Sequence, residues 1–318
     1  MDRPAEGAGP PAAAPAAARS PLRRWGGLAA GLLVLGFLAW ALVDGWSSVS
    51  SYDWNLEPWL VVLGVLVLLA FYATSALGYG AIIDRLHHPG PPALVTLSIW
   101  ARSLLGRYVP GNVLMVLGRV VLSRERGVPR RATLAATVYE QALSLGVAAA
   151  AGVIWLAAYS GSGDARRWLL VLVPLGLVLL HPRLFGPASA WVLRKAGREP
   201  LPRLLATRPL LGLLGWYTGI AALGGVGIWL LVRSAAGAEA GGPAFVGLAF
   251  LLSFAVSMIA FIFPSGLGIR EGAFALALAQ NVPGSVAVAL SVGSRLALSL
   301  VELAFIGGVV LIERRRRR

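Results

Sequence analysis

Long apolar runs separated by short charged segments are the main pattern of this chain. A helix of about 20 apolar residues crosses the roughly 30 Å hydrocarbon core of a bilayer. Several runs reach or approach that length, and each ends in charged or turn-forming residues. The pattern predicts an all-α polytopic membrane protein with about six full transmembrane helices. The predicted spans cover residues 25–43, 58–83, 132–159, 168–180, 209–232 and 285–312.

Residues 92–122 break this pattern. Their two apolar pieces, 92–105 and 113–122, are too short to cross, and both flanks carry arginines that predict the cytoplasmic side. We expect a re-entrant hairpin with Pro110 and Gly111 near its tip. The alternative is an amphipathic segment lying on the cytoplasmic surface.

A second break falls at residues 263–272, read Phe-Pro-Ser-Gly-Leu-Gly-Ile-Arg-Glu-Gly. Proline and glycine interrupt a helix, so the backbone groups they expose need partners in protein or a water-filled cavity. If the flanking spans are placed correctly, residues 244–283 begin and end outside. The short second arm favours a hairpin over two crossings, and a loop at the membrane surface is the alternative reading.

The two halves then share one order: span, re-entrant hairpin, span, with the hairpins entering from opposite sides. This order predicts an inverted-repeat arrangement, in which paired broken segments meet near the bilayer midplane. The symmetry is inferred from topology, because the halves show little residue-level similarity.

Composition and charge support a cell-membrane location. The chain is 57% hydrophobic and 13% charged, with a net charge of +14. The basic residues lie in short loops and the tail, which predicts cytoplasmic N- and C-termini and contact with anionic lipid, not nucleic acid. We expect a disordered arm at 1–21, a transmembrane domain at 22–312 with an inner elbow at about 183–208, and a basic tail at 313–318.

The residues that enzymes and metal sites need are scarce. There is no cysteine, and the three histidines lack ligand spacing. No His-Glu-x-x-His, Asp-rich metal motif, Ser-His arrangement or Walker loop occurs in the sequence. We therefore expect no enzymatic activity, no cofactor and no metal.

Several short motifs resemble one known family. They are Arg107-Tyr108-Val109-Pro110-Gly111-Asn112, Leu117-Gly118-Arg119, Arg126-Gly127-Val128-Pro129, Glu140-Gln141-Ala142-Leu143-Ser144-Leu145 and Pro264-Ser265-Gly266-Leu267-Gly268-Ile269-Arg270-Glu271-Gly272. In this order they resemble the flippase-like transmembrane family, which includes the membrane half of bacterial lysylphosphatidylglycerol synthase and archaeal proteins of glycan assembly. The resemblance covers about 92–312 and implies lipid translocation or handling. The aminoacyl-transfer domain of the bifunctional synthase has no counterpart here, so lysyl-lipid synthesis is not expected.

The charged residues among the apolar runs are the candidate site, since ionisable groups at membrane depth are costly. Arginine suits phosphate, and the glutamates would neutralise the arginines or attract a cationic headgroup. Arg295 and Glu302 are seven apart and share a helix face; a structural ion pair is the alternative role for them. Likewise, Gly266 and Gly268 would serve either a backbone break or close helix packing. The candidate substrate-binding residues are Arg107, Pro110, Gly111, Asn112, Arg119, Glu140, Pro264, Gly266, Gly268, Arg270, Glu271, Arg295 and Glu302.

Together these features predict a membrane protein that translocates a phospholipid or a lipid-linked intermediate between leaflets. The alternative is a non-transporting membrane subunit that supports a cell-envelope glycan or lipid-modifying enzyme. Neutral Asn112 stands where a basic residue would suit an anionic headgroup, so the headgroup stays open.

Overall fold

The computed structural model describes residues 43–54, 56–108, 113–161, 205–259 and 268–317, with isolated positions between them. Within these ranges the regular elements are α-helices and short 3-10 helices, and none is a strand. The predicted all-α fold is therefore confirmed.

Some predictions fall outside these residues. Apart from isolated positions, they are the N-terminal arm 1–21, the spans 25–43 and 168–180, and most of the elbow 183–208.

Four helices of the described residues are long and apolar enough to cross a membrane. The shortest has 29 residues, which at about 1.5 Å per residue exceeds the roughly 30 Å of hydrocarbon. They match the predicted spans 58–83, 132–159, 209–232 and 285–312, and they make this a multi-pass membrane protein. These helices are α3 (Pro58–Leu86), α6 (Arg130–Tyr159), α9 (Thr207–Ala236) and α12 (Gly284–Arg317).

The remaining elements are shorter. Helices α4 and α5 have 12 residues each, about 18 Å, which is too short to cross. Helix α2 lies where the sequence predicted only an outer loop. The bounds are α2 (Trp46–Ser51), α4 (Ala93–Leu104), η1 (Leu105–Tyr108), α5 (Val113–Arg124), η3 (Gly237–Ala240), α10 (Pro243–Ile259) and α11 (Ile269–Leu278).

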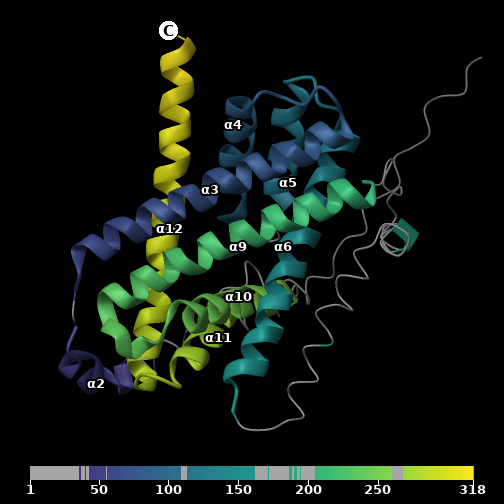
Figure 1. The fold of residues 1–318 in the computed structure, drawn as a ribbon. Coiled ribbons are helices and arrows are strands. Elements are labelled where there is room, and N and C mark those ends of the chain that lie inside the picture. Colours follow the sequence, from purple (N-terminus) through teal and green to yellow (C-terminus); the bar gives the residue numbers. More distant parts are fainter. Residues whose placement is uncertain are drawn as a thin grey trace, which may run out of the picture.

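Helices α3 and α9 run antiparallel side by side, and α12 crosses both (Figure 1). At one end the Glu57 N–H donates to the Ser234 carbonyl at 2.9 Å. Further along, glycine allows close approach: a Cβ on Gly227 would lie 2.7 Å from the Leu68 side chain. Small residues at such positions are the usual means of packing helices in lipid.

The helix ends sort into two groups. The end that holds Glu57 also holds the C-terminus of α6, because Trp155 Nε1 donates to the Phe245 carbonyl at 3.1 Å. The turn before α12 lies there too, since Asn281 Nδ2 donates to the Ala240 carbonyl at 3.4 Å. The starts of α3, α10 and α12 and the ends of α6 and α9 thus share one end of the bundle, which is the grouping that the sequence predicts for the outer side.

The first hairpin, α4–η1–α5, starts and finishes at the opposite end. There Glu313 of α12 accepts hydrogen bonds from Arg102 in α4 at 2.6 Å and from Arg126 after α5 at 3.0 Å. Between these contacts, Arg107 in η1 reaches Glu302, three turns or about 16 Å further along α12. The start of α4 and the end of α5 therefore lie at the same end of the bundle.

The second hairpin, α10–α11, belongs to the other end. Its last residues lead directly into α12 at Gly284, while the start of α11 lies beside the middle of α12. There the Ser291 hydroxyl donates to the Glu271 carbonyl at 2.8 Å. The described ends of the two hairpins thus approach the middle of α12 from opposite ends of the bundle.

Candidate functional site

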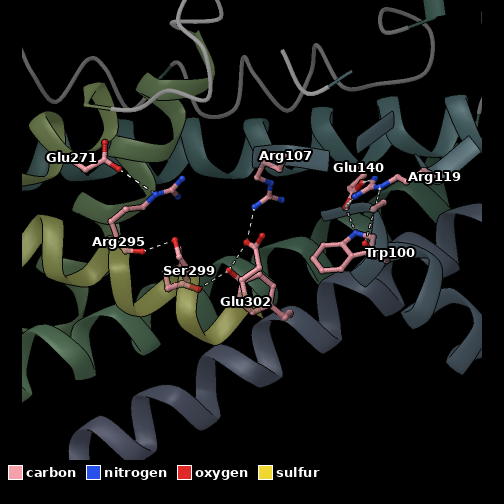
Figure 2. Close-up of polar contacts among 11 residues, drawn as sticks. Trp100, Arg107, Arg119, Glu140, Glu271, Arg295, Ser299 and Glu302 are labelled. Carbon is pink, nitrogen blue, oxygen red and sulfur yellow. Dashed lines mark hydrogen bonds and ion pairs between the residues drawn. The ribbon is translucent and has the colours of Figure 1, made fainter. Parts of the chain in front are cut away.

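Three ion pairs lie in a row through the middle of the protein (Figure 2). Each joins two different elements: α5 to α6, η1 to α12, and α12 to α11. Six of the predicted site residues make up the three pairs, and Arg270 lies beside the last. The pairs are Arg119–Glu140, Arg107–Glu302 and Arg295–Glu271.

The first pair is enclosed on all sides. Arg119 is 1% exposed and Glu140 5% exposed, and the Arg119 guanidinium donates to the Glu140 carboxylate. Arg119 Nε also donates to the Ser103 hydroxyl at 3.0 Å, and Trp100 Nε1 donates to Glu140 at 2.7 Å. The guanidinium lies 4.6 Å from the centroid of the Tyr79 ring. We name these five residues the closed cluster.

The closed cluster changes the interpretation of Arg119. The sequence grouped it with the phosphate-binding arginines, but its donors are taken by Glu140 and Ser103 and its face by an aromatic ring. It is not placed to reach a lipid headgroup in this conformation. The residue instead ties α3, α4, α5 and α6 together.

The second pair is open on its arginine side. Arg107 Nη1 donates to Glu302 Oε2 at 3.2 Å, and the Tyr72 hydroxyl donates to the same oxygen at 3.0 Å. Glu302 is 4% exposed, whereas the Arg107 side chain is 39% exposed. Arg107 is therefore the accessible member of this pair.

The third pair depends on the start of α11. Gly268 has φ of 85°, in the left-handed region that favours glycine, and its N–H donates to Glu271 Oε2 at 2.7 Å. Arg295 Nε lies 3.4 Å from the other oxygen, Oε1. The Gly-Ile-Arg-Glu-Gly motif is thus explained locally: glycine makes the turn, and the glutamate caps the helix it begins.

Arg270 has a different environment from these paired arginines. Its guanidinium carbon lies 4.6 Å from the centroid of the Phe250 ring and 5.5 Å from that of Phe254, both on α10. No carboxylate of the described residues forms an ion pair with it. Its charge is therefore not neutralised by an ion pair within the described part of the chain.

A pocket of about 240 Å³, a volume that includes its open mouth, lies between α10, α11 and α12. Two arginines, one glutamate and three serines supply its polar wall, and aromatic and leucine side chains supply the rest. The lining residues are Phe250, Ser253, Arg270, Glu271, Phe274, Ser291, Ser294, Arg295 and Leu298. The pocket combines an anion-binding wall with an apolar one.

Arg295 and Glu302 face the same side of α12, as their spacing predicted, but they do not pair with each other. Each is bound by a different hairpin, Arg295 by α11 and Glu302 by η1. The two positions are about 10 Å apart along the helix. We name Arg107, Arg270, Glu271, Arg295 and Glu302 the central site.

Five predicted site residues lie outside the described part of the chain: Pro110, Gly111, Asn112, Pro264 and Gly266. The structure adds others that the sequence did not indicate. Aromatic residues inside apolar runs give no signal of a polar role, and Glu313 was assigned to the tail. The added residues are Tyr72, Tyr79, Trp100, Ser103, Phe250, Phe254 and Glu313.

The described residues contain no group of His, Asp and Glu side chains that could hold a metal ion. The polar groups of the three ion pairs and of the pocket are arginine, glutamate and hydroxyl groups. Such groups bind anions and cations reversibly.

Comparison with protein-family models matches residues 26–305 to the family described as "Lysylphosphatidylglycerol synthase TM region". The match includes both hairpins and every residue of the central site. Comparison with curated proteins gives no match.

Proposed function

The chain belongs to the family of the lysylphosphatidylglycerol synthase TM region, and from this premise we propose that it translocates a phospholipid or a lipid-linked intermediate between membrane leaflets. The substrate class follows from arginines that suit a phosphate group. No covalent step is required, so the proposed protein is a transporter of lipid and not an enzyme.

The physical obstacle to translocation is the headgroup. Moving a phosphate through hydrocarbon without partners is costly, because a buried charge must be paired. Arginines carried on two hairpins and one long helix would lower that cost by accepting the phosphate in turn. The acyl chains would stay in the bilayer, beside the apolar faces of the helices.

The observation that carries the proposal is the position of Arg270. It lines the pocket between α10, α11 and α12 together with Arg295, and among the described residues no carboxylate is paired with it. The neighbouring Arg295 is held by Glu271, so the wall keeps one arginine charge in excess. An anionic group is the ligand that such a wall favours.

Translocation can be measured with fluorescent phospholipids in liposomes that contain the purified protein. Dithionite quenches only the outer leaflet, so quenching of inner-leaflet lipid reports movement across the bilayer. We expect Arg270→Ala to slow this quenching by about ten- to a hundredfold, the value of a charge-assisted hydrogen bond. The unfolding temperature should stay near that of the wild type.

Arg233→Ala is the matched control. Arg233 also lies over an aromatic ring, at 5.8 Å from the centroid of Trp229, but at the far end of α9. The Arg233→Ala variant should translocate lipid at the wild-type rate. If both variants slow translocation equally, the pocket is not the route.

A wild type that moves anionic, zwitterionic and aminoacylated lipids no faster than empty liposomes would contradict unaided translocation. A role as a non-transporting membrane subunit would then be the better hypothesis. In that case Arg270→Ala should disturb a complex with an envelope enzyme and leave lipid movement unchanged.

A further inference from the structure

Glu302 differs from the other two buried glutamates in how its oxygens are used. Glu140 and Glu271 each receive a donor or a cation on both carboxylate oxygens. In Glu302, Oε2 takes both donors, from Arg107 and Tyr72, while Oε1 is buried with no hydrogen-bond partner in the described structure. A buried carboxylate oxygen without a donor makes the charged form costly.

The surroundings of this carboxylate are largely aromatic. The Tyr72 ring stacks on Phe305 at 5.7 Å between centroids, and Trp100 meets Phe305 edge-on at 6.3 Å. Rings packed beside a carboxylate keep water from it on that side. The charge of Glu302 therefore depends on Arg107 more than on solvent.

Three titratable or charged groups face Glu302 from neighbouring elements. Tyr72 comes from α3 and Arg107 from η1, and both bind the carboxylate directly. Arg270 of α11 lies within electrostatic range of the Tyr72 hydroxyl. Of these two cations, Arg107 is the one in contact with the Glu302 carboxylate.

The other elements packed on α12 are α2, α4 and α9. Helix α2 carries no charged residue, and α9 carries its charges only near its two ends, at Arg208 and Arg233. In α4, Arg102 is bound to Glu313. None of these groups contacts the Glu302 carboxylate.

We propose that Glu302 is a proton-binding site coupled to phosphate binding at Arg107, an inference that rests on the proposed translocation of a phosphate-bearing lipid. The ionised carboxylate holds Arg107. A proton bound at Oε1 removes that negative charge and frees the guanidinium of the partly exposed Arg107 side chain for phosphate oxygens. No other bond forms or breaks.

The coupling works in both directions. Phosphate on Arg107 draws the cation away from Glu302 and so favours its protonation, as linkage between two sites requires. Lipid phosphate and proton then bind together. Translocation with this stoichiometry would follow a proton gradient across the membrane.

The test is calorimetric titration of the full-length protein in detergent with short-chain phosphatidylglycerol. It is run at one mildly acidic pH in two buffers of different ionisation enthalpy, so that the difference in heat counts the protons taken up. We expect about one proton per bound lipid for the wild type, as reciprocal linkage requires. Glu302→Gln should bind the lipid with no proton uptake.

Glu125→Gln, on the exposed turn after α5, is the control and should match the wild type. Arg107→Ala serves as a second variant should Glu302→Gln fail to fold. Without an arginine to release, its residual lipid binding should take up no proton.

The coupling is overturned if the wild type binds lipid without taking up a proton, if it shows no binding, or if Glu302→Gln takes up as many protons as the wild type. These outcomes are distinct from failure of translocation itself. A protein that shows proton-linked binding but no lipid movement in liposomes would overturn the proposed function and leave the proton site standing.

Discussion

The closed cluster and the central site are built from the same two residue types and behave as opposites. In the closed cluster, Arg119 and Glu140 are both buried, and each is bonded to further groups, Ser103 and Trp100. In the central site, some polar groups are not fully paired. Arg270 has no carboxylate partner among the described residues, and one oxygen of Glu302 has no donor. The Arg107 side chain is partly exposed.

The difference shows that burial of a charge does not by itself mark a substrate site. A buried pair with all its bonds made is a structural tie, because any ligand would have to break it first. A site for reversible binding needs donors or acceptors that are not already used. Counting the unused groups separates the two regions more clearly than counting the charges.

The largest effect should come from breaking the closed cluster. Glu140→Ala leaves Arg119 as a buried charge without a counter-ion, which typically costs about 3–5 kcal/mol. We expect a clearly lower unfolding temperature in detergent, followed by tryptophan fluorescence. Glu125→Ala, at an exposed carboxylate, should leave it unchanged.

The double variant Arg119→Met/Glu140→Leu sharpens this prediction. Replacing both charges by apolar side chains removes the unpaired group and should recover much of the lost stability. If Glu140→Ala unfolds at the same temperature as the wild type, the cluster is not a structural tie and the contrast with the central site fails.

A smaller effect is expected at the turn that positions the central site. Gly268→Ala places a Cβ on a left-handed residue, at a cost of about 1–2 kcal/mol. It should also slow lipid translocation, because the Gly268 N–H holds the Glu271 carboxylate. Both quantities are measured on one preparation, in detergent and in liposomes.

Gly272→Ala, in the same helix, should change the free energy of unfolding in the opposite direction. An added Cβ there would meet no atom within 4 Å, and alanine stabilises a helix interior by about 0.5–1 kcal/mol relative to glycine. Equal losses of stability and of translocation rate in the two variants would show that the left-handed conformation of Gly268 does not determine either quantity.

The smallest effect is expected at the end of the first hairpin. Glu313 is bound by Arg102 and Arg126, whose side chains are about one-third exposed. Partly exposed pairs contribute at most about 1 kcal/mol, and salt screens them. Glu313→Gln should lower the unfolding temperature slightly at low salt and not at high salt. A large decrease in unfolding temperature that salt does not reduce would show that the Glu313 ion pairs are a structural tie like the closed cluster.

The long helices and the hairpin boundaries were predictable because the bilayer fixes them. Apolar runs 58–83 and 285–312 are long enough to cross and the run 113–122 is not, so length distinguishes these two spans from that short segment. The shared face of Arg295 and Glu302 followed from helix periodicity in the same way. Helix α2, with 6 residues, is too short for such a pattern to reveal.

The partners of each charge were not predictable. Arg295 is bound by Glu271 and not by Glu302, and Arg119 is enclosed by Tyr79 and Trp100. These contacts join side chains on different helices, so they depend on how the helices pack. An aromatic residue within an apolar run looks the same whether it faces lipid or an arginine.

Three residues of α12 form ion pairs at different heights, and these pairs are divided between the two hairpins. The contacts at Glu302 and Glu313 belong to the first hairpin, and the contact at Arg295 belongs to the second. The two hairpins are therefore attached to α12 through separate ion pairs. Under the proposed translocation, separate attachments would let one set of pairs open while the other stays closed, so that no continuous water path is needed as lipid moves.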